Sequence, residues 1–120
     1  DDAASARGAS AHVRTILEAA PTLTFIACHF GGYHRLTDAL ASVVGTAAYL
    51  ETSWPPHVGG LGAERVRALI RTHGADRIVF GSDWPMADPG AEIGFLRSVG
   101  LTADEEERVL GGNLARVLGL

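Results

Sequence analysis

Residues 77–85, RIVFGSDWP, decide the fold class of this 120-residue chain. The first half of this stretch is an apolar run without alternating polar residues, which is typical of a strand covered on both faces in a parallel sheet. Two earlier runs have the same character, 23–30 (LTFIACHF) and 47–54 (AAYLETSW). We therefore predict three buried parallel strands, at 23–30, 47–54 and 77–83.

Helical patterns separate the predicted strands. Apolar side chains repeat with the spacing of one helix face in three windows: 10–20, 35–44 and 62–73. After the third strand, Thr102 opens a capping-box pattern, and Asn113 is predicted to cap a last helix over 114–118. The alternation of helix and strand, at about 30 residues per unit, predicts an α/β fold. We expect residues 1–120 to form one structural unit. Three parallel strands make a poor stand-alone sheet, so either further strands are missing or the sheet is small.

The composition argues against several functional classes. The net charge is −4 and the Arg residues are scattered, so no nucleic-acid partner is expected. No apolar run reaches the roughly 18 residues that span a bilayer, and the first residues show no signal-peptide pattern. The single cysteine, Cys28, cannot form an internal disulfide, which fits a reducing compartment. We therefore expect a cytoplasmic protein with no membrane partner, and the missing initiator Met fits a fragment of a longer chain.

Polar residues follow each predicted strand at its carboxyl end. His29 ends the first strand, residues 51–53 end the second and Asp83 ends the third. In parallel α/β folds the loops at this end converge, and active sites are built there. Imidazole and carboxylate are both ligands for Zn²⁺ or a similar ion. A half-buried, hydrogen-bonded His29 and a turn-forming Asp83 are the purely structural alternatives.

Strand alternation gives these side chains a direction. If Asp83 points into a barrel, Gly81 does too. If His29 points inward, Ala27 accompanies it and Cys28 faces the helices. We therefore expect Cys28 to be a small buried apolar residue, and we reject a nucleophile pair of Cys28 and His29.

Four segments resemble motifs of the amidohydrolase-related metal-dependent hydrolases, the family that includes aminocarboxymuconate-semialdehyde decarboxylase and the sugar-acid lactonases. Residues 27–32 (ACHFGG) resemble its HxGG strand end, and residues 77–85 resemble its last-strand signature. Residues 112–120 (GNLARVLGL) are similar to its closing helix. The stretch 49–53 (YLETS) resembles a further strand motif of the family, with Glu51 where Asp is more usual.

The resemblance implies a TIM-type (β/α)8 barrel, of which this chain would hold the C-terminal portion, strands six to eight with flanking helices. A full barrel takes about 250 residues. The missing N-terminal half of the barrel is therefore an expected partner, and the isolated chain is expected to be inactive and marginally stable. The family's His-x-His pair, which binds metal on its first strand, is absent from this sequence.

The resemblance also implies a divalent metal ion, with zinc as the expected metal. Asp83 would be a metal ligand and the general base. His29 would polarise the substrate or move a proton, and in some relatives a histidine at this place contacts the metal. These roles predict a metal-dependent hydrolase that acts on a small organic acid, lactone or amide through metal-activated water.

Two alternatives to this function stay open. A decarboxylase or other lyase of the same family would use the same strand ends. A non-catalytic α/β binding module, or a barrel remnant without metal, would use none of them. A flavodoxin-like domain would need a phosphate-binding or acidic first loop, which the sequence lacks. Self-association is compatible with each of these functions.

Three further residues are candidates for substrate contact. His57 lies in the loop after the second strand, Trp84 follows the last strand, and His34 lies just beyond the glycine pair. Ser53 could form a hydrogen bond near the mouth of the site, but it has no identifiable base, so a serine nucleophile is not expected. Residues 59–62 lack the Lys of a P-loop and the third glycine of a dinucleotide fingerprint, so no cofactor-binding loop is predicted.

Two histidines are assigned no function. His12 and His73 fall within helical patterns, and both are expected at the surface.

Overall fold

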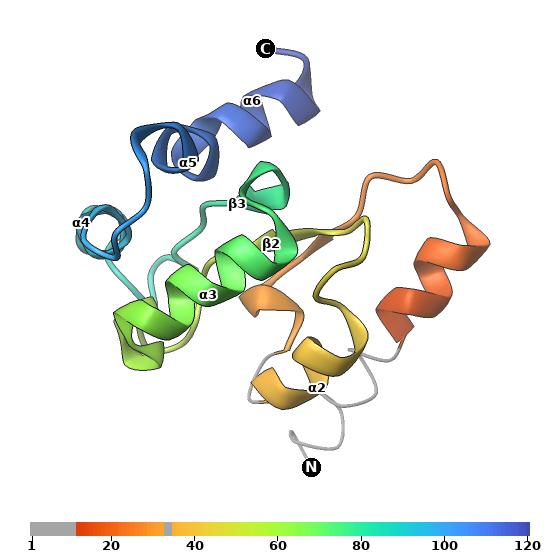
Figure 1. Cartoon of the computed structure of the whole chain (residues 1–120), viewed down its shortest axis with the longest axis horizontal. Helices are drawn as coiled ribbons and strands as arrows, with labels where there is room; N and C mark the ends of the chain where they lie inside the picture. The colour runs from red at the N-terminus through yellow and green to blue at the C-terminus, as the bar shows by residue number, and fades with distance from the viewer. Residues whose placement is uncertain (1–11, 33–34) are drawn as a thin grey trace.

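The structure is a computed structural model that describes residues 12–32 and 35–120 (Figure 1). Its strands form a three-stranded parallel sheet in the order β1-β2-β3. The strands are β1 (Ile26–Ala27), β2 (Tyr49–Glu51) and β3 (Ile78–Val79). All three lie within the predicted windows, and the predicted α/β fold with a parallel sheet is confirmed. The hydrogen-bonded segments are shorter than the apolar runs that predicted them.

Helices follow or precede each strand in the predicted order. The α-helices span 12–19, α2 (Leu36–Ser42), α3 (Ala63–His73), α4 (Pro89–Arg97), α5 (Ala103–Glu107) and α6 (Asn113–Leu118). The shorter turns are η1 (His29–Gly31), η2 (Val58–Leu61), η3 (Ala75–Arg77) and the π-helical turn η4 (Arg108–Gly112). The predicted capping box is present, because the Thr102 hydroxyl and the Glu105 carboxylate each accept a backbone N–H at the start of α5. Helix 12–19 and helices α4 to α6 lie on opposite sides of the sheet region in Figure 1.

One face of the sheet packs under the helices. The register pairs Ala27 with Leu50 and Leu50 with Ile78, so these three side chains share a face. They join Val66 and Ile70 of α3 in the buried core. Each fully buried aliphatic side chain of this kind contributes about 1.5–3 kcal/mol through removal from water. This packing fixes which side of the sheet the helices cover.

The predicted direction of the first strand was wrong. Ala27 faces the helices instead of the barrel interior, and Ile26, which pairs with Tyr49 on the other face, is 38% exposed. Cys28 is exposed and not a buried apolar residue. The reason is the register with β2, because Leu50 faces the helices and carries Ala27 to the same side.

Asn113 does not cap the last helix as predicted. Its side chain is fully buried, and its Nδ2 donates to the carbonyls of Ala75 at 2.6 Å and Ile78 at 2.7 Å. Because η4 runs directly into α6, the helix has no free amino end for Asn113 to cap. Arg116 donates to the Asp76 carbonyl at 2.8 Å beside it. The closing helix thus holds the segment that leads into β3.

His73 is buried, and the prediction of a surface position was wrong, whereas His12 is exposed as predicted. The backbone N–H of Gly45 donates to Nδ1 of His73 at 3.0 Å, so Nε2 carries the proton and donates to the Ala48 carbonyl at 2.6 Å. Burial lowers the pKa of the His73 imidazole, and the charge of Arg77 adds to this effect. The ring therefore acts as a neutral bridge between α3 and the segment before β2.

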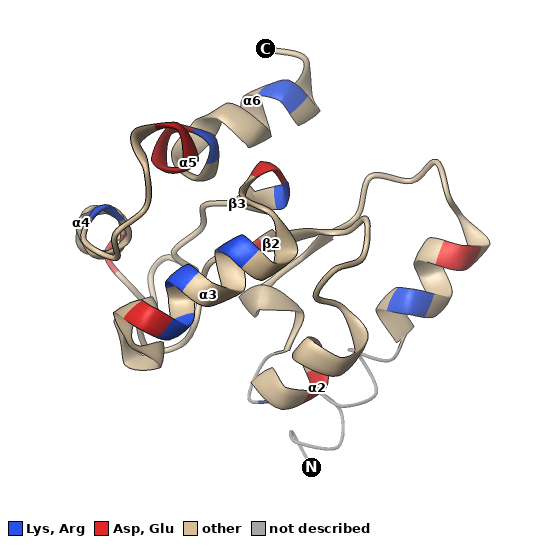
Figure 2. Ribbon diagram, in the orientation of Figure 1, with Lys and Arg blue, Asp and Glu red and all other residues tan. Residues whose placement is uncertain are grey.

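The charged residues lie mainly on the helical segments of the ribbon (Figure 2). Arg71 of α3 forms a two-point ion pair with Glu105 of α5, at 3.1 Å and 3.0 Å. No helix within the described ranges 12–32 and 35–120 is long and apolar enough to cross a membrane.

Candidate functional site at the carboxyl ends of the strands

The three strands are parallel, so their carboxyl ends lie at one edge of the sheet. The backbone turns sharply at this edge. His29 has φ of 56°, Phe30 of 53° and Asp83 of 60°, and these are the non-glycine residues with positive φ among those the structure describes. Such conformations cost on the order of 1–3 kcal/mol each and persist where the surroundings impose them. Two of the three are predicted site residues, which supports a functional interpretation of this edge.

His29 is held through its Nδ1 atom. That nitrogen lies 2.8 Å from Oγ of Ser53 and 3.2 Å from the Ser53 carbonyl oxygen. A carbonyl oxygen only accepts hydrogen bonds, so Nδ1 is the protonated nitrogen in this arrangement. In the neutral ring, the lone pair then lies on Nε2.

Glu51 and Ser53 extend this contact into a chain. The Ser53 hydroxyl donates to Oε1 of Glu51 at 2.7 Å, and the Ser53 backbone N–H donates to the other carboxylate oxygen. Ser53 has no solvent exposure. The sequence allowed Ser53 a hydrogen bond near the mouth of the site and gave Glu51 no role. The signal was present in the YLETS motif, where the two side chains stand two residues apart at a strand end.

Glycines let the backbones approach at this edge. A Cβ atom at Gly81 would lie 2.7 Å from the carboxyl carbon of Glu51, so a larger residue there would displace the Glu51 side chain. A Cβ atom at Gly32 would lie 2.5 Å from Cβ of Ala39 in α2. The glycines in both strand-end motifs therefore reflect close packing around the site.

Cys28 faces the acidic part of the site. Although Cys28 is exposed, partial burial raises the pKa of its thiol, and so do the charge of Glu51, a side-chain hydrogen bond with Glu51 and the charge of Asp83. A raised thiol pKa keeps the sulfur protonated, and a protonated thiol is a weak nucleophile. The sequence argued against a nucleophile pair of Cys28 and His29 because their side chains were expected to face apart. In the structure the argument against it is the raised pKa of the thiol.

Asp83 and Trp84 project from the end of β3. The Asp83 side chain is exposed, and its backbone carbonyl accepts the Met86 N–H at 2.8 Å. Trp84 is 69% exposed. The proposed roles of both residues stay predictions.

His57 lies on the same side of the fold, in the loop after β2. It is exposed and lines a shallow pocket of about 420 Å³ together with Asp88, Glu92 and Phe95. Glu92 is buried at the base of α4 and accepts the Val58 N–H at 2.9 Å. This bond ties the loop after β2 to the helix after β3. His34 lies outside the described residues.

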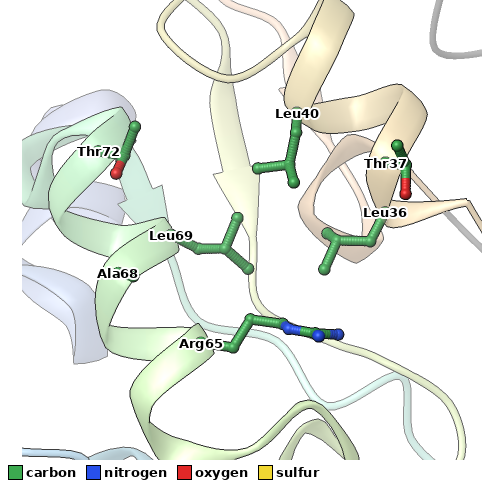
Figure 3. Close-up of a pocket in the computed structure, with 7 residues that line it drawn as sticks. All are labelled: Leu36, Thr37, Leu40, Arg65, Ala68, Leu69 and Thr72. Atoms are coloured by element: carbon green, nitrogen blue, oxygen red, sulfur yellow. The ribbon is translucent and has the colours of Figure 1, made fainter.

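A second pocket lies between α2 and α3 (Figure 3). It has a volume of about 290 Å³, and its walls are mainly apolar, with Leu36, Leu40 and Leu69 facing one another and Arg65 at one end. None of the predicted site residues that the structure describes lines it. It is a groove on the helical layer and is separate from the candidate site.

The donor atoms of Asp83 and His29 suit a divalent metal ion, since carboxylate and imidazole are common ligands of Zn²⁺ and Mn²⁺. The described part of the chain, however, brings together no group of three or more His, Cys, Asp or Glu side chains that could hold a metal ion. These residues therefore fit part of a metal site and not a complete one.

Comparisons with solved structures give the fold. An amidohydrolase from Burkholderia multivorans with bound zinc aligns with a TM-score of 0.75 at 18% identity, over 95% of this chain and 50% of that chain. A dihydroxybenzoic acid decarboxylase from a Polaromonas species, with bound manganese and an inhibitor, aligns with a TM-score of 0.65 at 19% identity, over 95% of this chain and 37% of that chain. A putative amidohydrolase from Staphylococcus aureus aligns with a TM-score of 0.62 at 26% identity, over 88% of this chain and 37% of that chain.

This chain thus spans between about a third and a half of the length of the structures it resembles. A search of curated proteins finds no match. The sequence model of the amidohydrolase family matches residues 3–120, which is nearly the whole chain. Membership of this family implies a TIM-barrel fold, of which the described residues hold a three-stranded parallel sheet. The chain belongs to the amidohydrolase family.

Proposed function

We propose that this chain supplies strands six to eight, with their helices, to a TIM-barrel enzyme that hydrolyses a small organic acid, lactone or amide with a divalent metal ion. The observation that supports this most is the shared left-handed backbone at His29 and Asp83, each at the carboxyl end of its strand. In TIM-barrel enzymes this end of the strands carries the active site.

The remaining strands of the barrel are the proposed partner of this chain. The exposed Ile26 on the face of β1 away from the helices is a side chain that a closed barrel would cover. The length of the aligned structures, about two to three times that of this chain, agrees with such a division. The further metal ligands would come from that part.

Each site residue has a proposed task. The Asp83 carboxylate would bind the metal and accept a proton from water. Nε2 of His29 would give a proton to, or accept one from, an oxygen of the substrate. A divalent ion, for which we propose zinc, would acidify bound water and polarise a carbonyl group. His57, Trp84 and His34 would form the substrate-contacting rim.

Decarboxylation is the second candidate, and one observation favours it. Two of the similar solved structures are decarboxylases, for dihydroxybenzoic acid and for 5-carboxyvanillate, and the same edge of the sheet can serve either reaction. Release of carbon dioxide from an aromatic acid would establish a lyase, and formation of a ring-opened acid from a lactone would establish a hydrolase.

The test uses the complete barrel protein, loaded with Zn²⁺ or Mn²⁺ and assayed against lactones, amides and aromatic acids. Asp83→Asn should lower turnover by roughly 100-fold or more and reduce the bound metal. His29→Ala should lose turnover and retain most of the metal. Asp104→Asn, on the exposed surface of α5, is the control and should behave as the wild type. An Asp83→Asn variant with full activity would overturn the proposal.

A further inference from the structure

We propose that Ser53 and Glu51 are positioning residues that hold neutral His29 in one tautomer, with its proton on Nδ1 and its lone pair on Nε2. What that lone pair does rests on the function proposed above. The assignment of the tautomer does not, since it follows from three hydrogen bonds at the strand ends.

The first of these bonds indicates that the proton is on Nδ1. The Ser53 carbonyl oxygen lies 3.2 Å from Nδ1 of His29 and cannot donate. An unprotonated Nδ1 would place two lone pairs against each other at this distance. The carbonyl therefore favours the tautomer with hydrogen on Nδ1.

The second and third bonds orient the Ser53 hydroxyl. Its single proton goes to Oε1 of Glu51 at 2.7 Å, which leaves an oxygen lone pair for Nδ1 of His29 at 2.8 Å. Glu51 also accepts the Ser53 backbone N–H through its other oxygen, so both carboxylate oxygens must be acceptors. An anionic acceptor makes such bonds stronger than neutral ones. Glu51 thus sets the direction of the hydroxyl, and the hydroxyl sets the tautomer of His29.

The direction of these hydrogen bonds differs from the direction found around a serine nucleophile. In a catalytic Ser-His-acid arrangement the hydroxyl donates to the imidazole, and the carboxylate binds the other side of the imidazole. Here the carboxylate binds the serine, and the imidazole donates to the hydroxyl. Ser53 is also completely buried, which denies a substrate access to its oxygen. The hydroxyl is a link in the chain and does not attack.

The consequence concerns the atom at which His29 can act. In the fixed tautomer, Nε2 carries the lone pair that can take up a proton or coordinate a cation. The same contacts with Ser53 orient the imidazole ring, which projects from a left-handed backbone with φ of 56° at His29. The orientation of the ring and the location of its proton are therefore set together.

The tautomer can be measured by nitrogen NMR of the metal-free complete barrel protein labelled at histidine, at about pH 8, where an ordinary histidine is neutral. The wild type should show a protonated Nδ1 and an unprotonated Nε2 for His29. In Glu51→Gln, the backbone N–H of Ser53 takes the amide oxygen, and the amide NH₂ faces the hydroxyl. The hydroxyl should then turn toward Nδ1 and shift His29 toward the other tautomer.

Conservative variants separate positioning from folding. Glu51→Asp keeps a carboxylate and should keep the wild-type tautomer, and Glu64→Gln on α3 is a charge-matched control that should change nothing. If the complete enzyme is active, Glu51→Gln should lower kcat by roughly 10–100-fold with a smaller effect on KM, and Glu51→Asp should restore most of it. Ser53→Ala removes the hydroxyl but keeps the backbone carbonyl, so it should retain the tautomer with hydrogen on Nδ1.

The outcomes distinguish the two proposals. A wild-type His29 protonated on Nε2, or a Glu51→Gln variant with the wild-type tautomer, would overturn the positioning role while leaving the test of Asp83 untouched. A protein without any turnover, but with the expected tautomer and its shift in Glu51→Gln, would contradict the proposed function and support the positioning role.

Discussion

His29 and Asp83 leave the extended conformation at the ends of different strands, and both adopt φ close to 60°. The sequence placed the two residues at the strand ends, but it could not give this geometry, because alternation assumes that the extended chain continues. Once the backbone turns, side-chain direction depends on local contacts. For His29 these are the Ser53 oxygens. Glu51 and Ser53 were therefore found only when the contacts were known.

His73 is another residue whose surroundings the sequence did not predict. Its helical spacing was recognised, but the two backbone groups that it bridges come from the segment 45–48, far away in sequence. A histidine that both accepts and donates internally can be buried at low cost, since each ring nitrogen has a partner.

The pH dependence of stability should report this burial. The pKa of His73 is lowered in the folded chain from the ordinary value of 6.5. The unfolded chain therefore binds a proton at a higher pH than the folded one, so stability increases with pH in that range. The His73 contribution should be complete above about pH 6.5 and be lost as the pH falls through the folded pKa. His73→Gln can keep both hydrogen bonds and should flatten this dependence in urea titrations at several pH values, whereas exposed His12→Gln should not. An equal slope in wild type and His73→Gln would contradict the assignment.

Element by element, the sequence predicted position better than orientation. The apolar runs and helical repeats identified the strands and helices because burial imposes these patterns locally. The facing of β1 was wrong because a strand of two paired residues takes its direction from the register with β2, which no local pattern encodes. The closing helix was recognised as a motif, but the role of Asn113 was not, since its partners lie 35 and 38 residues away.

The role of Asn113 can be separated from capping by two substitutions. Asn113→Ala should lower the free energy of unfolding by about 1–3 kcal/mol, because the carbonyls of Ala75 and Ile78 lose their buried donor. Asn113→Asp should cost more, because a carboxylate would face the two carbonyl oxygens. If Asn113 were a helix cap, Asp would be tolerated, since it is among the preferred capping residues. Denaturant unfolding of both variants decides this, with the exposed Arg108→Ala as control, and an Asn113→Asp variant as stable as the wild type would contradict the proposed anchor.

At the scale of the whole molecule, the fold and the candidate site agree with the same proposal. The described residues form a three-stranded sheet and bring together no group of three or more metal-ligating side chains, which fits the proposal that the rest of a barrel completes both. The sequence led to the same expectation through its resemblance to a family whose full barrel takes about 250 residues. The substrate could not be predicted, because the proposed division leaves part of the loops that would select it outside this sequence.

The last prediction follows from that division. The 120-residue chain alone should show no turnover and only marginal stability, because β1 and β3 each have a neighbouring strand on one side only among the described residues, and Ile26 is exposed. Co-expression with the preceding half of the barrel should give a one-to-one complex that unfolds cooperatively. The complex should retain more structure at a given urea concentration than the chain alone, and it should have metal-dependent activity. Asp83→Asn in this complex should abolish activity but preserve assembly, since its side chain is exposed and outside the core. A cooperative unfolding transition of the chain alone, as a monomer, would contradict the proposed division of the barrel.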